Sequence, residues 1–312
     1  MSITTKGIMW GVGPQSVIGT AVAAAAGIRV RSEGGVSDLK PNMEHVNVPM
    51  QDGRWGESDY TQRAGIARPG WPGAPLFLTA SLLQDLCQQV MDEAGPDGSG
   101  DYTYTLQAAG VNPAADKYLS IVRRNTLASS KDKRLTAGVV SSIKLSSGES
   151  QNFVKMDCDF LGTVLNLVYD GSGDTYTLPS EAIKLHKGLT FKIGATPTRC
   201  PEYDVNMNFN LKGILDNAAA IQEFILGKFE CSGTVRIPWA DEDVINDFVT
   251  SISNTITFLW GVSGAAGYIE ITVPIKYTEP DEDVDNDVRL RQGLPFEYRE
   301  TDAQAFQIKL HP

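Results

Sequence analysis

The sequence is poor in the residue types on which most enzyme chemistry depends. It has 312 residues but only three histidines and four cysteines. The histidines are His45, His186 and His311, and the cysteines are Cys87, Cys158, Cys200 and Cys231. No histidine has a partner at metal-ligand or triad spacing, and no two cysteines form a C-x-x-C pair. Because nucleophile elbows, Walker loops and dinucleotide fingerprints are also missing, we predict neither an enzyme nor a bound metal or cofactor.

Long apolar runs and clusters of basic residues are missing as well. The small-residue stretch 21–26 is too short to cross a bilayer, and residues 1–16 lack the apolar core of a signal peptide, so no membrane segment is predicted. The chain has 27 Lys and Arg against 38 Asp and Glu, a formal net charge of −11. It therefore lacks the basic patch of a nucleic-acid-binding protein. The scattered cysteines indicate free thiols in a reducing cytosol.

One acidic segment, residues 279–287, invites a metal interpretation because aspartate recurs at every second position. Oxygen-rich loops of this kind can bind calcium. However, Asn286 stands where an EF-hand loop needs glycine, and Gln292 stands where it needs a bidentate glutamate. A solvated or channel-facing acidic loop is therefore preferred over a calcium site.

What the sequence does contain is a pattern of short strands that returns after about 161 residues. Residues 27–31 are echoed by 188–192, in each case a glycine followed by alternating apolar and basic positions. Residues 45–48 are answered by 206–209, again with the apolar residues on one parity. Such alternation is typical of half-buried strands.

Each half also contains one predicted helix. Residues 82–86 and 244–248 place apolar side chains at helical spacing around a shared aspartate. Thr79 or Ser81 can cap the first helix, and Asp241 can cap the second.

Further strands follow each helix in the same order, with threonine and aromatic residues that favour a pleated surface. They are predicted at 102–106, 118–121, 139–145 and 153–160 in the first half, and at 255–259, 268–271, 294–298 and 305–310 in the second. The matches predict an all-β fold with minor α, built as two tandem β-sandwich or barrel domains with one flanking helix each. The domains are expected at 27–170 and 171–312, after an N-terminal assembly arm at 1–26. The alternative is one continuous domain whose halves look alike through strand periodicity alone.

Three segments of the sequence together form a pattern that is similar to that of a known protein family. Residues 140–145 lead through Ser146-Ser147-Gly148-Glu149-Ser150 into 153–162, Arg236-Ile237-Pro238-Trp239 enters the second predicted helix, and a hairpin at 268–274 precedes the acidic loop. In these features, which span most of its length, the chain resembles the tail tube proteins of long-tailed bacteriophages. No single motif among them is diagnostic.

The resemblance implies a structural virion protein whose sandwich domains join those of neighbouring subunits into an inner barrel around a DNA channel. With two domains per chain, a homotrimer would form a pseudo-sixfold ring, and a plain hexamer is the alternative. Implied partners are further copies of the chain, the tape measure, the tail terminator and distal tail proteins, and DNA would pass through without specific binding. The protein would assemble in the host bacterial cytoplasm and reside in the virion tail. The alternatives are another tail or injection-system component with the same sandwich, such as a terminator, and a carbohydrate-binding or hydrolytic β-sandwich protein.

Two carboxylates are candidates for the channel wall. Asp157 and Asp159 alternate with Met156, Cys158 and Phe160, so they lie on the face opposite those apolar residues. An acidic wall repels phosphate and would let DNA slide. The alternative is an outer, solvated face.

A long stretch, residues 49–75, holds Trp55, Tyr60 and Trp71 among glycine, proline and charged residues. It is too long for an idle connection in a compact domain, and aromatic residues on such an arm are typical interface anchors. We expect the three aromatic residues to contact the next ring. The alternative is that they fold back onto their own sandwich.

Overall fold

A computed structural model gives the fold of the chain. It describes residues 8–15, 27–30, 38–41, 43–48, 61–113, 115–125, 132–149, 151–170, 176–177, 181–215, 221–238, 254–278, 281–284, 290–300 and 305–312. The strands of the first half are β1 (Ile8–Gln15), β2 (Gly27–Val30), β3 (Met43–Val48), β4 (Thr61–Ala67), β5 (Gly70–Phe77), β6 (Met91–Ala94), β7 (Tyr102–Leu106), β8 (Tyr118–Asn125), β9 (Asp132–Gly148), β10 (Lys155–Leu161) and β11 (Val164–Tyr169). Those of the second half are β12 (Tyr176–Thr177), β13 (Leu189–Ile193), β14 (Thr196–Thr198), β15 (Glu202–Asn208), β16 (Lys212–Ile214), β17 (Glu223–Ile225), β18 (Glu230–Pro238), β19 (Asn254–Trp260), β20 (Tyr268–Tyr277), β21 (Asp281–Val284), β22 (Leu290–Tyr298) and β23 (Gln307–His311). The helical elements are α1 (Ala80–Val90), η1 (Ala115–Lys117) and η3 (His186–Gly188).

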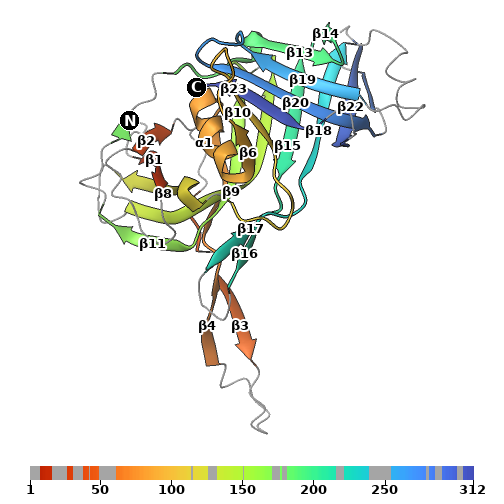
Figure 1. Cartoon of the computed structure of the whole chain (residues 1–312). Helices are drawn as coiled ribbons and strands as arrows, with labels where there is room; N and C mark the ends of the chain where they lie inside the picture. Colours follow the sequence, from red (N-terminus) through yellow and green to blue (C-terminus); the bar gives the residue numbers. More distant parts are fainter. Residues whose placement is uncertain are drawn as a thin grey trace, which may run out of the picture.

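Two layers of antiparallel strands form the body of the molecule (Figure 1). The first layer runs in the order β5-β10-β9-β15-β18-β22. The second runs β6-β7-β23-β20-β19-β13-β14. Strand β20 joins them, because its residues 268–272 pair with β23 while 275–277 pair with β22. The prediction of an all-β fold with minor α is confirmed.

Aromatic side chains fill the space between the two layers. Tyr203 on β15 lies 5.0 Å from Phe258 and 6.4 Å from Trp260, both on β19, measured between ring centroids. Phe191 on β13 adds a further ring 5.2 Å from Phe258. All four side chains are buried. Burial of such large apolar surfaces is the main source of stability in a sandwich of this kind.

A third sheet, in the order β12-β2-β1-β8-β9-β11, lies beside the sandwich (Figure 1). Strand β9 belongs to both sheets: residues 132–138 pair with β8 and β11, and residues 139–148 pair with β10 and β15. Between these parts Ala137 has a φ of +50°, a value that side chains other than glycine rarely adopt. The strand therefore turns from one sheet into the other at this residue.

The buried side chain of Gln89, on α1, completes the hydrogen bonding at this turn. Its Nε2 donates to the carbonyl oxygens of Gly138, at 2.9 Å, and of Lys117, at 3.0 Å. Its Oε1 accepts from the backbone N–H of Val140 at 3.0 Å. One glutamine thus satisfies three backbone groups where β9 leaves the regular ladder.

The N-terminus of α1 is capped from both halves of the chain. Thr79, one of the two predicted caps, accepts from the N–H of Leu82 through Oγ1 at 3.3 Å. The carboxylate of Glu181, about a hundred residues further on, accepts from the N–H groups of Ala80 and Ser81 at 2.5 and 2.9 Å. An acidic group is favourable at this end of a helix because of the free amides and the helix dipole.

The two sequence halves are connected by direct strand pairing. β9 pairs with β15, and β7 pairs with β23, so the described strands do not separate at residue 170. The division into domains at 27–170 and 171–312 stays a prediction. Part of the expected N-terminal arm, residues 8–15, forms β1 inside the third sheet. The predicted helix at 244–248 and its cap lie outside the described residues.

A hairpin of β3 and β4 projects from the body beyond the small β16–β17 hairpin (Figure 1). Val48 pairs with Thr61, so residues 49–60 connect the two strands. In the acidic segment, β21 pairs with β22, and the rest of the segment lies outside the described residues. No helix in the described parts of the chain is long and apolar enough to span a membrane.

Candidate functional site

The outer face of the first layer is polar. Along β10 and β15 the buried residues alternate with half-buried or exposed ones. The register aligns the polar positions of neighbouring strands, with Asp157 opposite Lys144 on β9, Lys144 opposite Asn206 on β15, and Asn206 opposite Ser232 on β18. One continuous polar face results, opposite the apolar face that packs into the core.

This polar face is hollowed into an open groove of about 820 Å³. Its lining residues are Gly73, Ser141, Ser142, Lys144, Asp157, Asp159, Leu161, Asp204, Asn206, Asn208, Asn210, Leu211, Lys212, Ser232 and Gly233. Both predicted channel carboxylates are among them. Their position opposite Met156, Cys158 and Phe160 follows the predicted alternation.

Asp159 has a structural task in this groove. Its Oδ1 accepts from the N–H of Gly73 on β5 at 2.7 Å, and its Oδ2 accepts from Ser142 Oγ on β9 at 2.7 Å. The pairing of β10 shifts register at this point on both sides, and the carboxylate bridges the two neighbouring strands there. Asp157 lies on the same face, opposite Lys144 and Pro75.

Acidic side chains outnumber basic ones on this face. Six carboxylates lie on it, from Asp157, Asp159, Glu202, Asp204, Glu230 and Glu297, against five described basic groups, from Lys144, Lys155, Lys212, Arg236 and Lys276. Two ion pairs cross between strands, Lys144 to Asp204 at 2.7 Å and Arg236 to Glu202 at 2.8 Å. The described charges on this face therefore nearly balance, with a small excess of carboxylates and no basic patch that would bind a polyanion.

The three predicted arm aromatics do not lie together. Trp55 and Tyr60 fall outside the described residues, between β3 and β4. Trp71 lies in β5 and is fully buried, with its ring 6.0 Å from that of Phe160 on β10. For Trp71 the alternative therefore holds. Its indole packs into its own chain and has no exposed surface with which to contact a neighbouring subunit ring.

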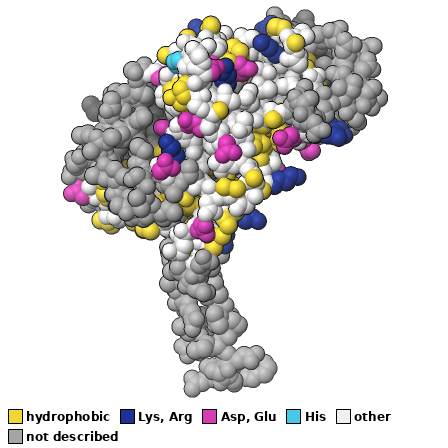
Figure 2. Space-filling model, in the orientation of Figure 1, with side chains coloured by type: hydrophobic (Ala, Val, Ile, Leu, Met, Phe, Trp, Pro, Cys, Tyr) yellow, Lys and Arg dark blue, Asp and Glu magenta, His cyan; other side chains and the backbone are white. Residues whose placement is uncertain are grey.

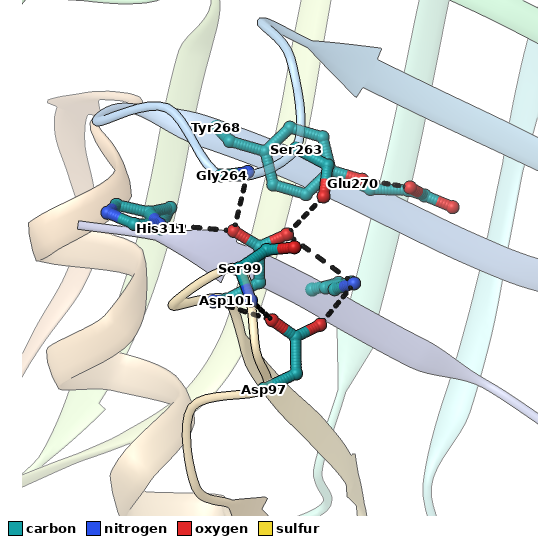
Figure 3. Close-up of polar contacts among 9 residues, drawn as sticks. Asp97, Ser99, Asp101, Ser263, Gly264, Tyr268, Glu270 and His311 are labelled. Carbon is teal, nitrogen blue, oxygen red and sulfur yellow. Dashed lines mark hydrogen bonds and ion pairs between the residues drawn. The ribbon is translucent and has the colours of Figure 1, made fainter.

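A second polar cluster ties the two halves of the chain together (Figure 3). Fully buried Asp101, in the loop before β7, accepts from Ser263 Oγ at 2.5 Å and from the N–H of Gly264 at 3.0 Å. His311 Nδ1 lies 3.1 Å from Oδ1, the oxygen that also accepts from Gly264, and Lys309 Nζ lies 3.4 Å from Oδ2, which accepts from Ser263. Lys309 also pairs with Asp97 at 2.8 Å.

Electrostatics hold this cluster in its charged form. Burial opposes ionisation of Asp101, but the hydrogen bonds from Ser263, Gly264, His311 and Lys309 outweigh it and lower its pKa. The hydrogen bond from Lys309 is the main reason why the pKa of Asp97 is lowered to about 2. The cluster is not a catalytic triad, because Ser263 donates its proton to the aspartate and not to the imidazole.

We expect the cluster to contribute stability that acid removes. A carboxylate with a lowered pKa stabilises the fold above its ordinary pKa, and this contribution is lost as pH falls through the lowered value. Asp101→Asn should therefore lower the free energy of unfolding by about 1.5–3 kcal/mol at pH 7. The difference from wild type should shrink below about pH 4. Urea titrations at pH 7 and pH 3 measure both values. Exposed Asp116→Asn is the control, and an equal loss in that variant would contradict the prediction.

This cluster could not be found from the sequence, since Asp101 and His311 are 210 positions apart and only the pairing of β7 with β23 brings them together. Of the other two histidines, His186 has no metal or triad partner among the described residues, and the side chain of His45 is not described. Burial lowers the pKa of His186, whose ring stacks 6.2 Å from Tyr203.

All four cysteines are free and buried, and burial raises the pKa of Cys200 and Cys231 to about 12. The prediction of free thiols is confirmed.

The sandwich, its polar outer face and its projecting hairpin define a β-rich structural protein. Comparison with protein families gives the same class and a narrower assignment. The chain belongs to the phage tail tube protein family, whose model matches residues 13–299, and this confirms the resemblance found in the sequence. That family is structural and forms part of the virion tail. No curated protein gives a significant match.

Proposed function

We propose that this chain is the major tail tube subunit, which assembles into stacked rings around the channel for phage DNA ejection. The observation that supports this most is the first layer, a six-stranded antiparallel sheet with a buried apolar face and a polar one. No described strand pairs with the outer side of β5 or of β21, although β20 pairs with the far end of β22 at residues 296–298. A sheet of this kind can be continued by neighbouring copies into a closed barrel.

The composition of this layer supports a trimeric, pseudo-sixfold ring. The first half of the chain supplies β5, β10 and β9, and the second half supplies β15, β18 and β22. Each half thus contributes three strands, so one chain could supply two equivalent parts of a ring. Negative-stain electron microscopy of concentrated protein tests the function, and the symmetry of a single ring tests the stoichiometry. Protein that stays monomeric at high concentration would contradict the proposal.

We further propose that the polar face, with Asp157 and Asp159, lines the channel and lets DNA slide without specific binding. Glu230 and Glu297 are exposed on this face and opposite Asn208 and Ser232, respectively. The double variant E230K/E297K changes the charge of each subunit by four units. Its tubes should retain short duplex DNA at low salt, and the retention should fall steeply with added salt. Wild-type tubes should retain none.

Co-sedimentation of tubes with labelled duplex measures this difference. The matched control is the double variant D92K/D116K, which makes the same four-unit change at exposed positions of β6 and η1. Equal DNA retention by both variants would mean that the polar face is not the channel wall. Asp159 is left intact in this test because it bridges β5 and β9.

The β3–β4 hairpin, with Trp55 and Tyr60 in its connection, is proposed as the contact between stacked rings. Replacing residues 49–60 by an Asn-Gly turn preserves the pairing of β3 with β4 and leaves β5 untouched. The variant should form single rings but few tubes, at unchanged thermal stability. Electron microscopy and a melting curve check this, with the double variant W55A/Y60A as the finer probe. Tubes of normal length from the shortened chain would exclude the hairpin as the stacking device.

The remaining proposals follow from membership in the family. The tape measure, the tail terminator and distal tail proteins are the proposed partners besides further copies of the chain, and assembly is proposed to take place in the host cytoplasm. No observation favours the carbohydrate-binding alternative. Trp71 and Trp260, which such a protein would place in a binding cleft, are core residues here.

A further inference from the structure

The three large sheets have six edge strands among the described residues, and these differ in how they are protected against pairing with another chain. Five of them carry devices that commonly block such pairing, namely proline, charge or very short length. These are Pro72 and Pro75 in β5, Asp92 and Glu93 in β6, Pro197 in β14, Asp281, Glu282 and Asp283 in β21, and the length of two residues in β12. The sixth is β11, whose sequence Val-Leu-Asn-Leu-Val-Tyr contains neither proline nor charge, and whose pairing with β9 is interrupted by one register shift, between Asn166 and Tyr169.

Strand β11 also exposes apolar side chains. Val164 and Leu167 are each 50% exposed, and Val168 is 73% exposed. Figure 2 shows hydrophobic side chains at the lower left margin of the molecule, where Figure 1 places β11. The strand pairs with β9 on one side, and no described strand pairs with its other side. Unprotected apolar edges are uncommon in soluble monomers because they promote association.

The pattern of exposure indicates what covers this strand. Val164 and Leu167 have opposite parities, so apolar surface is exposed on both faces of the sheet edge. Val168 lies where the pairing with β9 shifts register, between Asn166 and Tyr169. A membrane or a flat protein surface would cover one face only. An added strand, by contrast, pairs with the backbone and packs its side chains against both faces. The N–H of Val168 now donates to the side-chain Oδ1 of Asn166 at 3.1 Å, a local bond that a neighbouring carbonyl can replace.

We propose that the outer edge of β11 is an interface to a second copy of this chain, which adds a strand there when subunits assemble. The occupant is a copy of the same chain because the family forms tubes and because the chain is acidic overall, which disfavours an acidic membrane surface. The inference rests on the proposed function, and it names a contact outside the channel-lining sheet.

Val168→Lys places a charge at this edge, as protected edge strands do. Because the side chain is largely exposed, the monomer should keep the circular dichroism spectrum and melting temperature of the wild type. The fraction of protein in tubes should fall about tenfold or more, since the lysine would be buried without a partner in the interface. Val168→Ile should assemble normally. Val262→Lys, at a valine 72% exposed in the loop between β19 and β20, is the matched control for the added charge.

Hydrogen exchange of wild-type protein gives a direct second measurement. Amides of β11 should exchange at least about tenfold more slowly in tubes than in monomers, because pairing protects them. Normal assembly of Val168→Lys, or unchanged exchange of β11 in wild-type tubes, would overturn the inference. If Val262→Lys also blocks assembly, the exchange result decides. Failure of the wild type to form any tube would instead remove the proposed function, so the two failures are distinguishable.

Discussion

Trp71→Ala is expected to lower the free energy of unfolding by about 3–5 kcal/mol, the usual loss for a fully buried tryptophan cut to alanine. The side chain has no exposed surface, and its ring stacks on Phe160 in the neighbouring strand. Its removal leaves a cavity between β5, β10 and the core that the surrounding strands cannot fill without moving. The effect should be visible in the isolated monomer, before any assembly takes place.

Urea denaturation followed by far-ultraviolet circular dichroism measures this loss. Trp71→Phe keeps an aromatic ring in the site and should lose roughly half as much. The result separates two roles for this residue. A variant that folds with wild-type stability but fails to form tubes would show that Trp71 acts at an interface after all.

Gln89→Leu should have the second largest effect, a loss of about 3 kcal/mol or more. The substitution keeps the size of the side chain and removes its polar atoms. The carbonyl oxygens of Gly138 and Lys117 and the N–H of Val140 therefore lose their hydrogen-bond partner. Each buried backbone group without a partner costs about 1–3 kcal/mol. Two of these hydrogen bonds lie at Gly138 and Val140, where β9 passes from one sheet to the other, so the substitution should destabilise this part of β9 most.

The neighbouring glutamine is the control for this substitution. Gln88 is only partly buried, and its Nε2 donates to Glu93 Oε2 at 2.7 Å near the surface. Gln88→Leu should change the stability by less than about 0.5 kcal/mol. Hydrogen exchange at Val140 should rise in Gln89→Leu and stay unchanged in Gln88→Leu. Equal stability of the two variants would show that water or a shift of the backbone replaces the lost bonds.

Local features of the fold could be predicted from the sequence because they depend on residues close together in the chain. The helix around Leu83 and Leu86, its cap Thr79 and the alternation around Asp157 are all of this kind. The glycines at 261, 264 and 267 are local in the same sense, because all three adopt positive φ in the hairpin loop between β19 and β20, a conformation that glycine favours.

Long-range arrangements could not be predicted, because they depend on which strands pair. Nothing near Trp71 in sequence distinguishes it from Trp55, yet β5 places Trp71 in the core. The cap supplied by Glu181 and the pair of Asp101 with His311 join segments about 100 and 210 positions apart. The two roles of β9 were hidden as well, since the strand reads as one continuous run although Ala137 turns it between sheets.

The pairing of β7 with β23 has a consequence for the order of synthesis. Asp101 leaves the ribosome 210 residues before His311, which takes about 10–40 s at roughly 5–20 residues per second. During that interval β7 can pair only with β6, and the polar cluster around Asp101 lacks Lys309 and His311, which belong to β23. The second layer of the nascent chain therefore stays incomplete until translation has passed β23.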